Sequence, residues 1–141
     1  MSKFTVGFVF DSSLEHVLLV HKQRPEWQAG KVNGIGGKIE PGETALECIA
    51  RECEEESTLK IPPSDWLHFG TIHQPQGNVE VLAAAYGGGH SDASQNDHEA
   101  VEWFPINHLP DNVMQNLHFL IPAAKLKLEG YHLEKLEIHY K

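Results

Sequence analysis

Apolar residues recur in short stretches along the chain, either alternating with polar residues or in unbroken runs, which is the pattern of β-strands. These stretches are residues 3–10, 16–21, 66–73, 79–86 and 100–104. The stretch 16–21 is almost entirely apolar, which indicates a central strand covered on both faces. Near the end of the sequence, Leu136, Ile138 and Tyr140 alternate with polar residues and predict a strand at the edge of the sheet.

A helical pattern follows the turn at residues 40–43. Thr44 and Glu47 have the spacing of a capping box, in which each side chain bonds the backbone amide of the other residue. The apolar positions beyond them lie on one helix face, which predicts packing against a core. These positions are Leu46, Ile49, Ala50 and Cys53.

A second helix is predicted from Pro110 and Asp111 to about Leu128, with a kink at Pro122. Strands, helix, strands, helix and strand then follow one another without an internal repeat. This order predicts an α+β fold, with a mixed sheet covered by helices on its two faces. The length of 141 residues and the 40% hydrophobic content predict a single domain over residues 1–141.

The first helix carries a cluster of acids. Glu52, Glu55 and Glu56 stand at i, i+3 and i+4, so their carboxylates converge on one helix face and repel each other. A solvated acidic face is the usual explanation of such a run. The alternative is a site for Mg²⁺ or Mn²⁺, because these hard ions prefer clustered oxygen donors.

The sequence around these acids resembles the signature box of the Nudix hydrolase family, especially members of the MutT type and the oxidised-purine nucleoside triphosphatases. The matching positions are Gly37, Glu43, Arg51, Glu52, Cys53, Glu55, Glu56 and Leu59. Thr58 departs from the family, which has a glycine there to end the helix in a left-handed conformation. A β-branched residue adopts that conformation at a cost of about 1 kcal/mol or more.

The resemblance implies the Nudix α/β/α sandwich and a set of metal ligands. They are Glu52, Glu55, Glu56 and the backbone carbonyl of Gly36, with Glu99 as a further ligand and Asp97 and Glu102 as competing candidates. Glu52 is implied as the general base. Glu43 and Arg51 are implied to form a salt bridge that orients the loop against the helix; a surface charge pair of little consequence is the alternative.

Three residues are candidates for substrate binding. Trp27 offers a face for stacking on a base, and Asn33 can pair its amide with a purine edge. Lys38 can reach a phosphate. A loop anchor, a turn residue and a solvated lysine, respectively, are the structural alternatives.

Three functions follow from these residues. The favoured one is Mg²⁺-dependent hydrolysis of nucleoside triphosphates to monophosphate and pyrophosphate. Cleavage of ADP-ribose or another nucleotide-linked diphosphate is the second, weakly supported by Pro75, which lies sixteen residues after Leu59. A sensor that binds a nucleotide without hydrolysing it is the third, although a pure binder has no need of three crowded carboxylates.

The composition of the whole chain limits the kinds of partner that the protein is expected to bind. A formal net charge of −9 without a basic run argues against binding to a nucleic-acid polymer, so the expected partner is a small nucleotide. Cys48 and Cys53 point in different directions on one helix and are expected to stay reduced, as in the cytoplasm. No leader or membrane span is expected. The ten histidines are scattered and show no zinc-ligand spacing.

Overall fold

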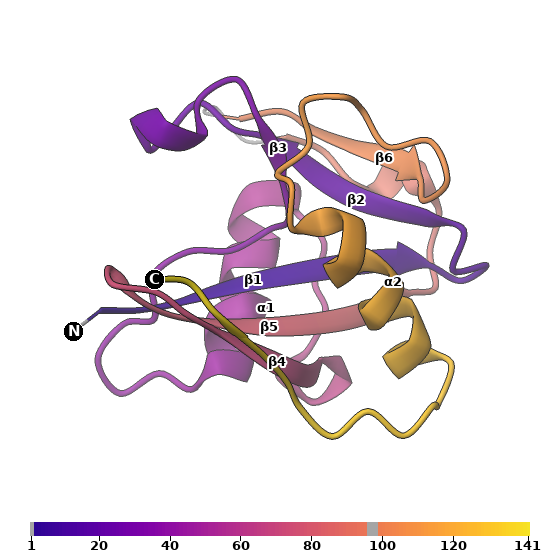
Figure 1. The fold of residues 1–141 in the computed structure, drawn as a ribbon. Helices are drawn as coiled ribbons and strands as arrows, with labels where there is room; N and C mark the ends of the chain where they lie inside the picture. The colour runs from indigo at the N-terminus through magenta and orange to yellow at the C-terminus, as the bar shows by residue number, and fades with distance from the viewer. Residues whose placement is uncertain (1, 96–98) are drawn as a thin grey trace.

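The computed structural model describes residues 2–95 and 99–141, and its centre is a seven-stranded mixed sheet (Figure 1). The strands run in the order β3-β2-β1-β5-β4-β7, and β6 pairs with β2 off this path. Their bounds are β1 Ser2–Asp11, β2 His16–His21, β3 Val32–Asn33, β4 Leu67–His73, β5 Gly77–Tyr86, β6 Val101–Pro105 and β7 Leu136–His139. The five predicted internal strands are all present, with bounds that differ by one or two residues at some ends.

The sheet is mixed because two of its pairings are parallel. Strands β1 and β5 run parallel over the whole length of β1, from Ser2 opposite Gly77 to Asp11 opposite Tyr86. Strand β7 pairs in parallel with β4 and forms the predicted edge of the sheet. The remaining pairs are antiparallel.

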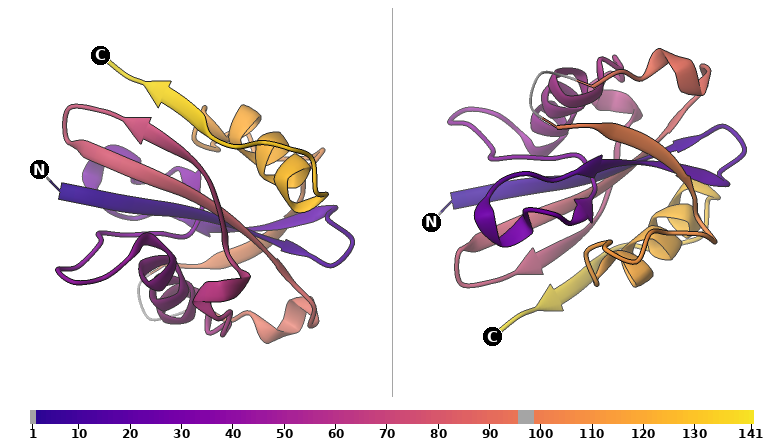
Figure 2. Two further views of the ribbon diagram at one scale, coloured as in Figure 1. Left: turned by 90° about the horizontal axis from the view of Figure 1, so that it is seen from below. Right: turned by 90° about the horizontal axis from the view of Figure 1, so that it is seen from above.

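Two helices cover opposite faces of the sheet, α1 (Ala45–Ser57) and α2 (Leu117–Leu128) (Figure 2). Alternate residues of β1 supply the two cores, since successive side chains of a strand point to opposite faces. Phe8 packs in the cluster that contains Leu120 of α2, whereas Val9 packs in the cluster that contains Ile49 of α1. The predicted α/β/α sandwich is therefore confirmed.

The predicted start of the second helix is wrong: α2 begins at Leu117, several residues beyond Pro110 and Asp111. The intervening segment instead forms a bridge to β3. The amide of Val32 donates to the carbonyl of Asn112 (3.0 Å), and the amide of Met114 donates to the carbonyl of Val32 (2.8 Å). Backbone groups bonded to a strand in this way are not available for helical hydrogen bonds.

Within the part of the chain that the structure describes, the connections between these elements contain three short 3₁₀ turns: η1 (Glu26–Gln28), η2 (Pro63–Asp65) and η3 (His90–Asp92). The first follows β2 and the third follows β5. Among the described residues, no helix is both long enough and apolar enough to cross a membrane.

Candidate active site

The start of α1 is fixed by the predicted capping box. The hydroxyl oxygen of Thr44 accepts the amide of Glu47 at 3.1 Å, and the carboxylate of Glu47 accepts the amide of Thr44 at 2.9 Å. The predicted apolar stripe packs on the sheet, with Ile49 and Cys53 fully buried. Because both the start and the buried face of the helix are determined, the direction of the acidic face is determined as well.

The glycine-rich loop runs between α1 and β1. Its backbone pairs with the strand: the amide of Thr5 donates to the carbonyl of Gly37 at 2.8 Å, and Gly7 and Ile35 exchange two bonds. A β-carbon on Gly37 would lie only 2.5 Å from Oε1 of Glu52. Glycine at this position therefore lets the loop lie directly against the acidic face of the helix.

Glu52 and Glu56 are the acids that the fold brings together. Both carboxylates are largely removed from solvent, and they lie close enough for the charge of one to influence the other. The amide of Gly36 donates to Oε2 of Glu56 at 3.2 Å. Gly36, whose carbonyl is a further candidate ligand, therefore lies beside the two acids. Burial and the neighbouring charge of Glu52 raise the pKa of Glu56 to about 8, and burial also raises the pKa of Glu52.

This pair has the chemistry of a cation site. Arg51 lies against Glu52, but burial and the charge of Glu52 still disfavour the ionised form of Glu56, so a shared proton or a further bound cation stabilises the pair. A divalent ion with oxygen preference, Mg²⁺ or Mn²⁺, fits a donor set made of carboxylates and backbone oxygens. The donors in the structure thus fit the metal that the acidic cluster suggests.

Glu55 is more exposed than Glu52 and Glu56. Its side chain is 56% exposed, and one carboxylate oxygen lies 3.2 Å from Nη1 of Arg51. The three glutamates predicted to converge thus differ in burial: Glu52 and Glu56 are mostly shielded from solvent, whereas Glu55 lies on the exposed rim of the site.

Arg51 connects the loop to the acidic face. Its Nε donates to Oε2 of Glu43 at 2.7 Å and its Nη2 to Oε1 at 3.0 Å, which is a bidentate pair. Its Nη1 donates to Glu52 at 2.9 Å. The hydrogen bond from Arg51 lowers the pKa of Glu43 to about 2, against the opposing effect of burial. The ion pair implied by the resemblance is present, and both partners are mostly shielded from solvent.

Of the two candidates outside the helix that the structure describes, Glu99 is buried and Glu102 is not. Oε2 of Glu99 accepts the amides of Gln23 (2.6 Å) and Arg24 (3.2 Å), and Nζ of Lys22 donates to Oε1 at 3.1 Å. Burial opposes its ionisation, but these donors outweigh burial and lower its pKa. Glu102 instead lies on the surface, 2.8 Å from His21. Asp97 is outside the described residues.

Lys22 is a residue that the sequence analysis missed. It bonds Glu99, and its charge lies close enough to Glu56 to lower the pKa of that carboxyl. It is therefore a mostly buried cation that contacts one candidate metal ligand and electrostatically influences another. A lysine at the end of a strand has no sequence signal of its own, since its significance comes from contacts with residues far along the chain.

The three substrate-binding candidates occupy different environments. Trp27 is 63% exposed on η1, so it is not an anchor packed on the sheet. The amide nitrogen of Asn33 donates to Gln28 at 3.0 Å, and its oxygen accepts the amide of Gly34 at 2.8 Å. Asn33 thus also shapes the start of the glycine loop. Lys38 is exposed, and its carbonyl accepts a bond from Arg51.

Comparison with known proteins places this arrangement in a family. The model of the NUDIX domain matches residues 1–122. The human 8-oxo-dGDP phosphatase NUDT18 is 29% identical over 133 residues, which are 92% of this chain and 41% of that protein. The NAD-capped RNA hydrolase NudC of Stutzerimonas stutzeri is 29% identical over 92 residues, 65% of this chain and 33% of that protein.

The chain therefore spans less than half the length of these curated relatives. Among solved structures, the NUDIX hydrolase from Nitrosomonas europaea superimposes with a TM-score of 0.77 over 99% of this chain and 78% of that one, at 14% identity. This likeness shows a common fold. Since the family model covers most of the sequence, the chain belongs to the Nudix hydrolase family.

Proposed function

We propose that this protein hydrolyses nucleoside triphosphates to a nucleoside monophosphate and pyrophosphate, and that it requires Mg²⁺ or Mn²⁺. The observation that carries the proposal is the pair of Glu52 and Glu56, which are only 15% and 9% exposed and lie against the glycine loop. Such a pair is costly unless a cation compensates it, and a cation beside a water-accessible loop is suited to a phosphate substrate.

Each residue of the site has a role in this proposal. Glu52, Glu55, Glu56, Glu99 and the carbonyl of Gly36 would hold the divalent ions. When bound, such ions neutralise phosphate oxygens and stabilise a leaving phosphate group. The carboxylate of Glu52 would accept a proton from the attacking water. Glu43 and Arg51 would position Glu52, since Arg51 binds both carboxylates.

Lys22 extends this arrangement. Its ammonium group bonds Glu99 and reduces the charge repulsion felt by Glu56. We therefore assign it a positioning role, in which it holds the buried acid of the loop near the acids of the helix.

The nucleotide would be recognised by residues near η1 and the glycine loop. Trp27 offers an exposed aromatic face for stacking, and Lys38 an exposed ammonium group for a phosphate. Asn33 would contribute by shaping the loop and by presenting its amide to the base. Stacking on an aromatic side chain contributes about 1–3 kcal/mol per base.

A second candidate is the hydrolysis of a diphosphate that joins a nucleotide to another group, as in ADP-ribose. The similarity to NAD-capped RNA hydrolases favours it, because the cap named there contains such a linkage. The acidic net charge of −9 argues that this chain would act on a small molecule of this class, without a bound polymer.

A substrate panel tests both candidates. The full chain with Mg²⁺ is incubated with nucleoside triphosphates, their oxidised purine forms, the diphosphates, ADP-ribose, NAD and an NAD-capped RNA, and the products are separated chromatographically. Monophosphate and pyrophosphate from a triphosphate support the first candidate. Preferential cleavage of ADP-ribose or NAD supports the second. Equal turnover by the Glu56→Gln variant, or in excess EDTA, would contradict both.

A further inference from the structure

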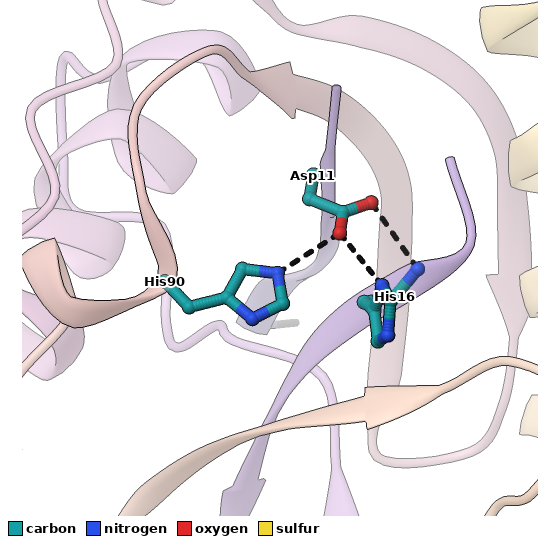
Figure 3. Close-up of side chains that lie close together, drawn as sticks. All are labelled: Asp11, His16 and His90. Carbon is teal, nitrogen blue, oxygen red and sulfur yellow. Dashed lines mark hydrogen bonds and ion pairs between the residues drawn. The ribbon is translucent and has the colours of Figure 1, made fainter. Parts of the chain in front are cut away.

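Three side chains from separate segments converge at the end of β1, beyond its pairing with the glycine loop, and Figure 3 shows how they lie. They are Asp11 at the end of β1, His16 at the start of β2 and His90 at the start of η3. Nδ1 of His16 lies 2.7 Å from Oδ2 of Asp11, and Nε2 of His90 lies 2.9 Å from the same oxygen. Both ring nitrogens therefore point at the same carboxylate oxygen, and the three atoms lie within 4.8 Å of one another.

This cluster is separate from Glu52 and Glu56. The glycine loop beside those acids pairs with β1 at Thr5 and Gly7, six and four residues before Asp11. At about 3.3 Å per residue the pairing lies about 13–20 Å from Asp11 along the strand. The cluster therefore needs an explanation of its own.

The carboxylate of Asp11 is held in one orientation. Its Oδ1 accepts three bonds, from the hydroxyl of Ser13 (2.8 Å) and from the amides of His16 (3.2 Å) and Glu15 (3.3 Å). The other oxygen, Oδ2, is thereby directed at the two histidines. Asp11 is buried, and although burial opposes its ionisation, bonds from His90, Ser13 and His16 lower its pKa.

The imidazoles are also held in position. The ring of His90 stacks on Trp103, with centroids 4.5 Å apart and planes 11° from parallel, and Nε1 of Trp103 donates to the carbonyl of His90. The ring of His16 lies edge-on to that of His90 at 5.0 Å. The side chains of His16 and His90 are 35% and 44% exposed, so the cluster opens to water on the side opposite the buried acid.

We propose that Asp11, His16 and His90 bind a transition-metal ion of the Zn²⁺ class, with water completing the coordination. Two imidazoles and a carboxylate with an open position are a donor set that Zn²⁺, Co²⁺ and Ni²⁺ accept, whereas Mg²⁺ prefers oxygen donors alone. The contacts that orient Asp11 and His90 correspond to the outer partners that ligands of such ions usually have.

Binding requires a modest shift of the two rings. Donors of a tetrahedral site with bonds of about 2.0–2.1 Å lie about 3.3 Å apart, so each ring nitrogen would withdraw from Asp11 by about half an ångström. His90 follows three consecutive glycines, Gly87 to Gly89, whose backbone can absorb such a shift. The proton now donated to Asp11 would move to the other nitrogen of each neutral ring.

A second group of possible ligands provides a comparison. His73, Glu137 and His139 also lie close together, but their carboxylate is exposed on the edge strand and is shared with Lys135 at 3.5 Å. The two rings stack face to face at 4.3 Å. This group has no buried acid with a fixed orientation, so it is the weaker candidate and a suitable control.

The test is a titration of the full chain with Co²⁺ in excess Mg²⁺, which keeps the helix acids occupied. Four-coordinate Co²⁺ with nitrogen ligands absorbs visible light much more strongly than six-coordinate Co²⁺ among oxygen ligands. His16→Asn and His90→Gln place an amide nitrogen near the bonding nitrogen of each ring, so the bonds to Asp11 can persist while the imidazole is lost. His73→Gln makes the same kind of change at the control group.

The wild-type chain and His73→Gln are expected to show the intense absorption with one equivalent of Co²⁺, and Zn²⁺ should abolish it. Each of the other two variants should bind at least about 100-fold more weakly, since loss of an outer partner alone costs 10–100-fold. Zn²⁺ should raise the unfolding midpoints of the wild type and His73→Gln, and it should leave those of His16→Asn and His90→Gln unchanged. Equal binding by the wild type and His90→Gln, or no intense absorption in the wild type, would overturn the proposal.

Discussion

The guanidinium of Arg51 binds both carboxylate oxygens of Glu43, with Nε 2.7 Å from Oε2 and Nη2 3.0 Å from Oε1. The same side chain donates to Glu52 through Nη1. One residue therefore fixes both the turn before α1 and a buried acid on it. A point charge cannot make these bonds at once, which makes the planar shape of arginine as important here as its charge.

Arg51→Lys should for this reason lower both stability and activity. We expect a loss of about 1–2 kcal/mol in the free energy of unfolding, as for lost bonds between charged groups, together with a lower kcat. Denaturant titration and steady-state kinetics measure the two effects. Arg24→Lys is the matched control, because it makes the same chemical change away from α1.

The stability loss caused by Arg51→Lys should depend on pH. The folded-state pKa of Glu43 is lowered to about 2, so the contribution of the pair is present above the ordinary pKa of 4.5. It should disappear as the pH falls toward 2. A difference between wild type and Arg51→Lys that stays constant down to pH 2 would show that the pair is not its source.

The acids of α1 should differ in importance according to burial. Glu56→Gln keeps the shape of a buried residue and removes its charge, so we expect kcat to fall at least about 100-fold. Glu55→Gln should cost less, because Glu55 lies on the exposed rim. Glu54→Gln, on the exposed side of the same helix, should leave kcat unchanged. The reverse order of effects would contradict the assignment of the buried pair.

The metal-free protein should lose stability as the pH rises from about 4.5 to about 8. In this range folded Glu56 keeps a proton that the unfolded chain has released, because burial and Glu52 raise its pKa. Mg²⁺ should restore the lost stability at pH 8 by replacing the proton. Thermal unfolding midpoints in EDTA, with and without Mg²⁺, measure both effects. The unfolding midpoint of Glu56→Gln in EDTA should change less with pH than that of the wild type. An equal pH dependence in the two proteins would refute the explanation.

Substitutions of Thr58 measure the free-energy cost of having threonine where the family has glycine. Thr58 caps α1 with φ of 65° and ψ of −2°, so the helix ends in the left-handed conformation even without glycine. Its hydroxyl also bonds the carbonyl of Asp92 at 3.2 Å. Thr58→Gly and Thr58→Ala both lose that bond, but only glycine relieves the backbone strain. We expect the glycine variant to be more stable than the alanine variant by about 1 kcal/mol in denaturant titrations.

Trp27 tests the proposed contact with the base. Trp27→Ala should raise KM for nucleotides through lost stacking, and Trp27→Phe should recover most of the effect. The free energy of unfolding should change by less than about 0.5 kcal/mol in both, because the side chain is exposed. A stability loss with unchanged KM would identify Trp27 as a packing residue.

Local signals made much of this structure predictable. The capping box of Thr44 and Glu47 and the stripe that includes Ile49 and Cys53 depend on residues within two or three turns. The strands were found because their alternation corresponds directly to the two faces of the sheet. The metal-ligand candidates Glu52 and Glu56 were also found from local spacing, since they lie four residues apart on one helix.

Long-range contacts were not predictable. The late start of α2 depends on the pairing of Val113 with Val32, which no local propensity encodes. Lys22 gains its importance from Glu99, which lies 77 positions away in the sequence. Likewise, His90 lies 79 positions from Asp11 in the sequence, and only the fold brings it to the cluster.

The last strand decides which part of the sheet remains open to other chains. Strand β7 occupies the outer side of β4, and the amide of Tyr140 bonds the carbonyl of His73 beyond the end of the pairing. Without β7, the seven-residue β4 would present unpaired backbone groups, a template onto which a strand of another molecule can add. On β7 itself, Glu137 and His139 are exposed, and polar or charged side chains on an edge discourage such addition. Strand β7 therefore covers the edge of β4 and presents a polar edge in its place.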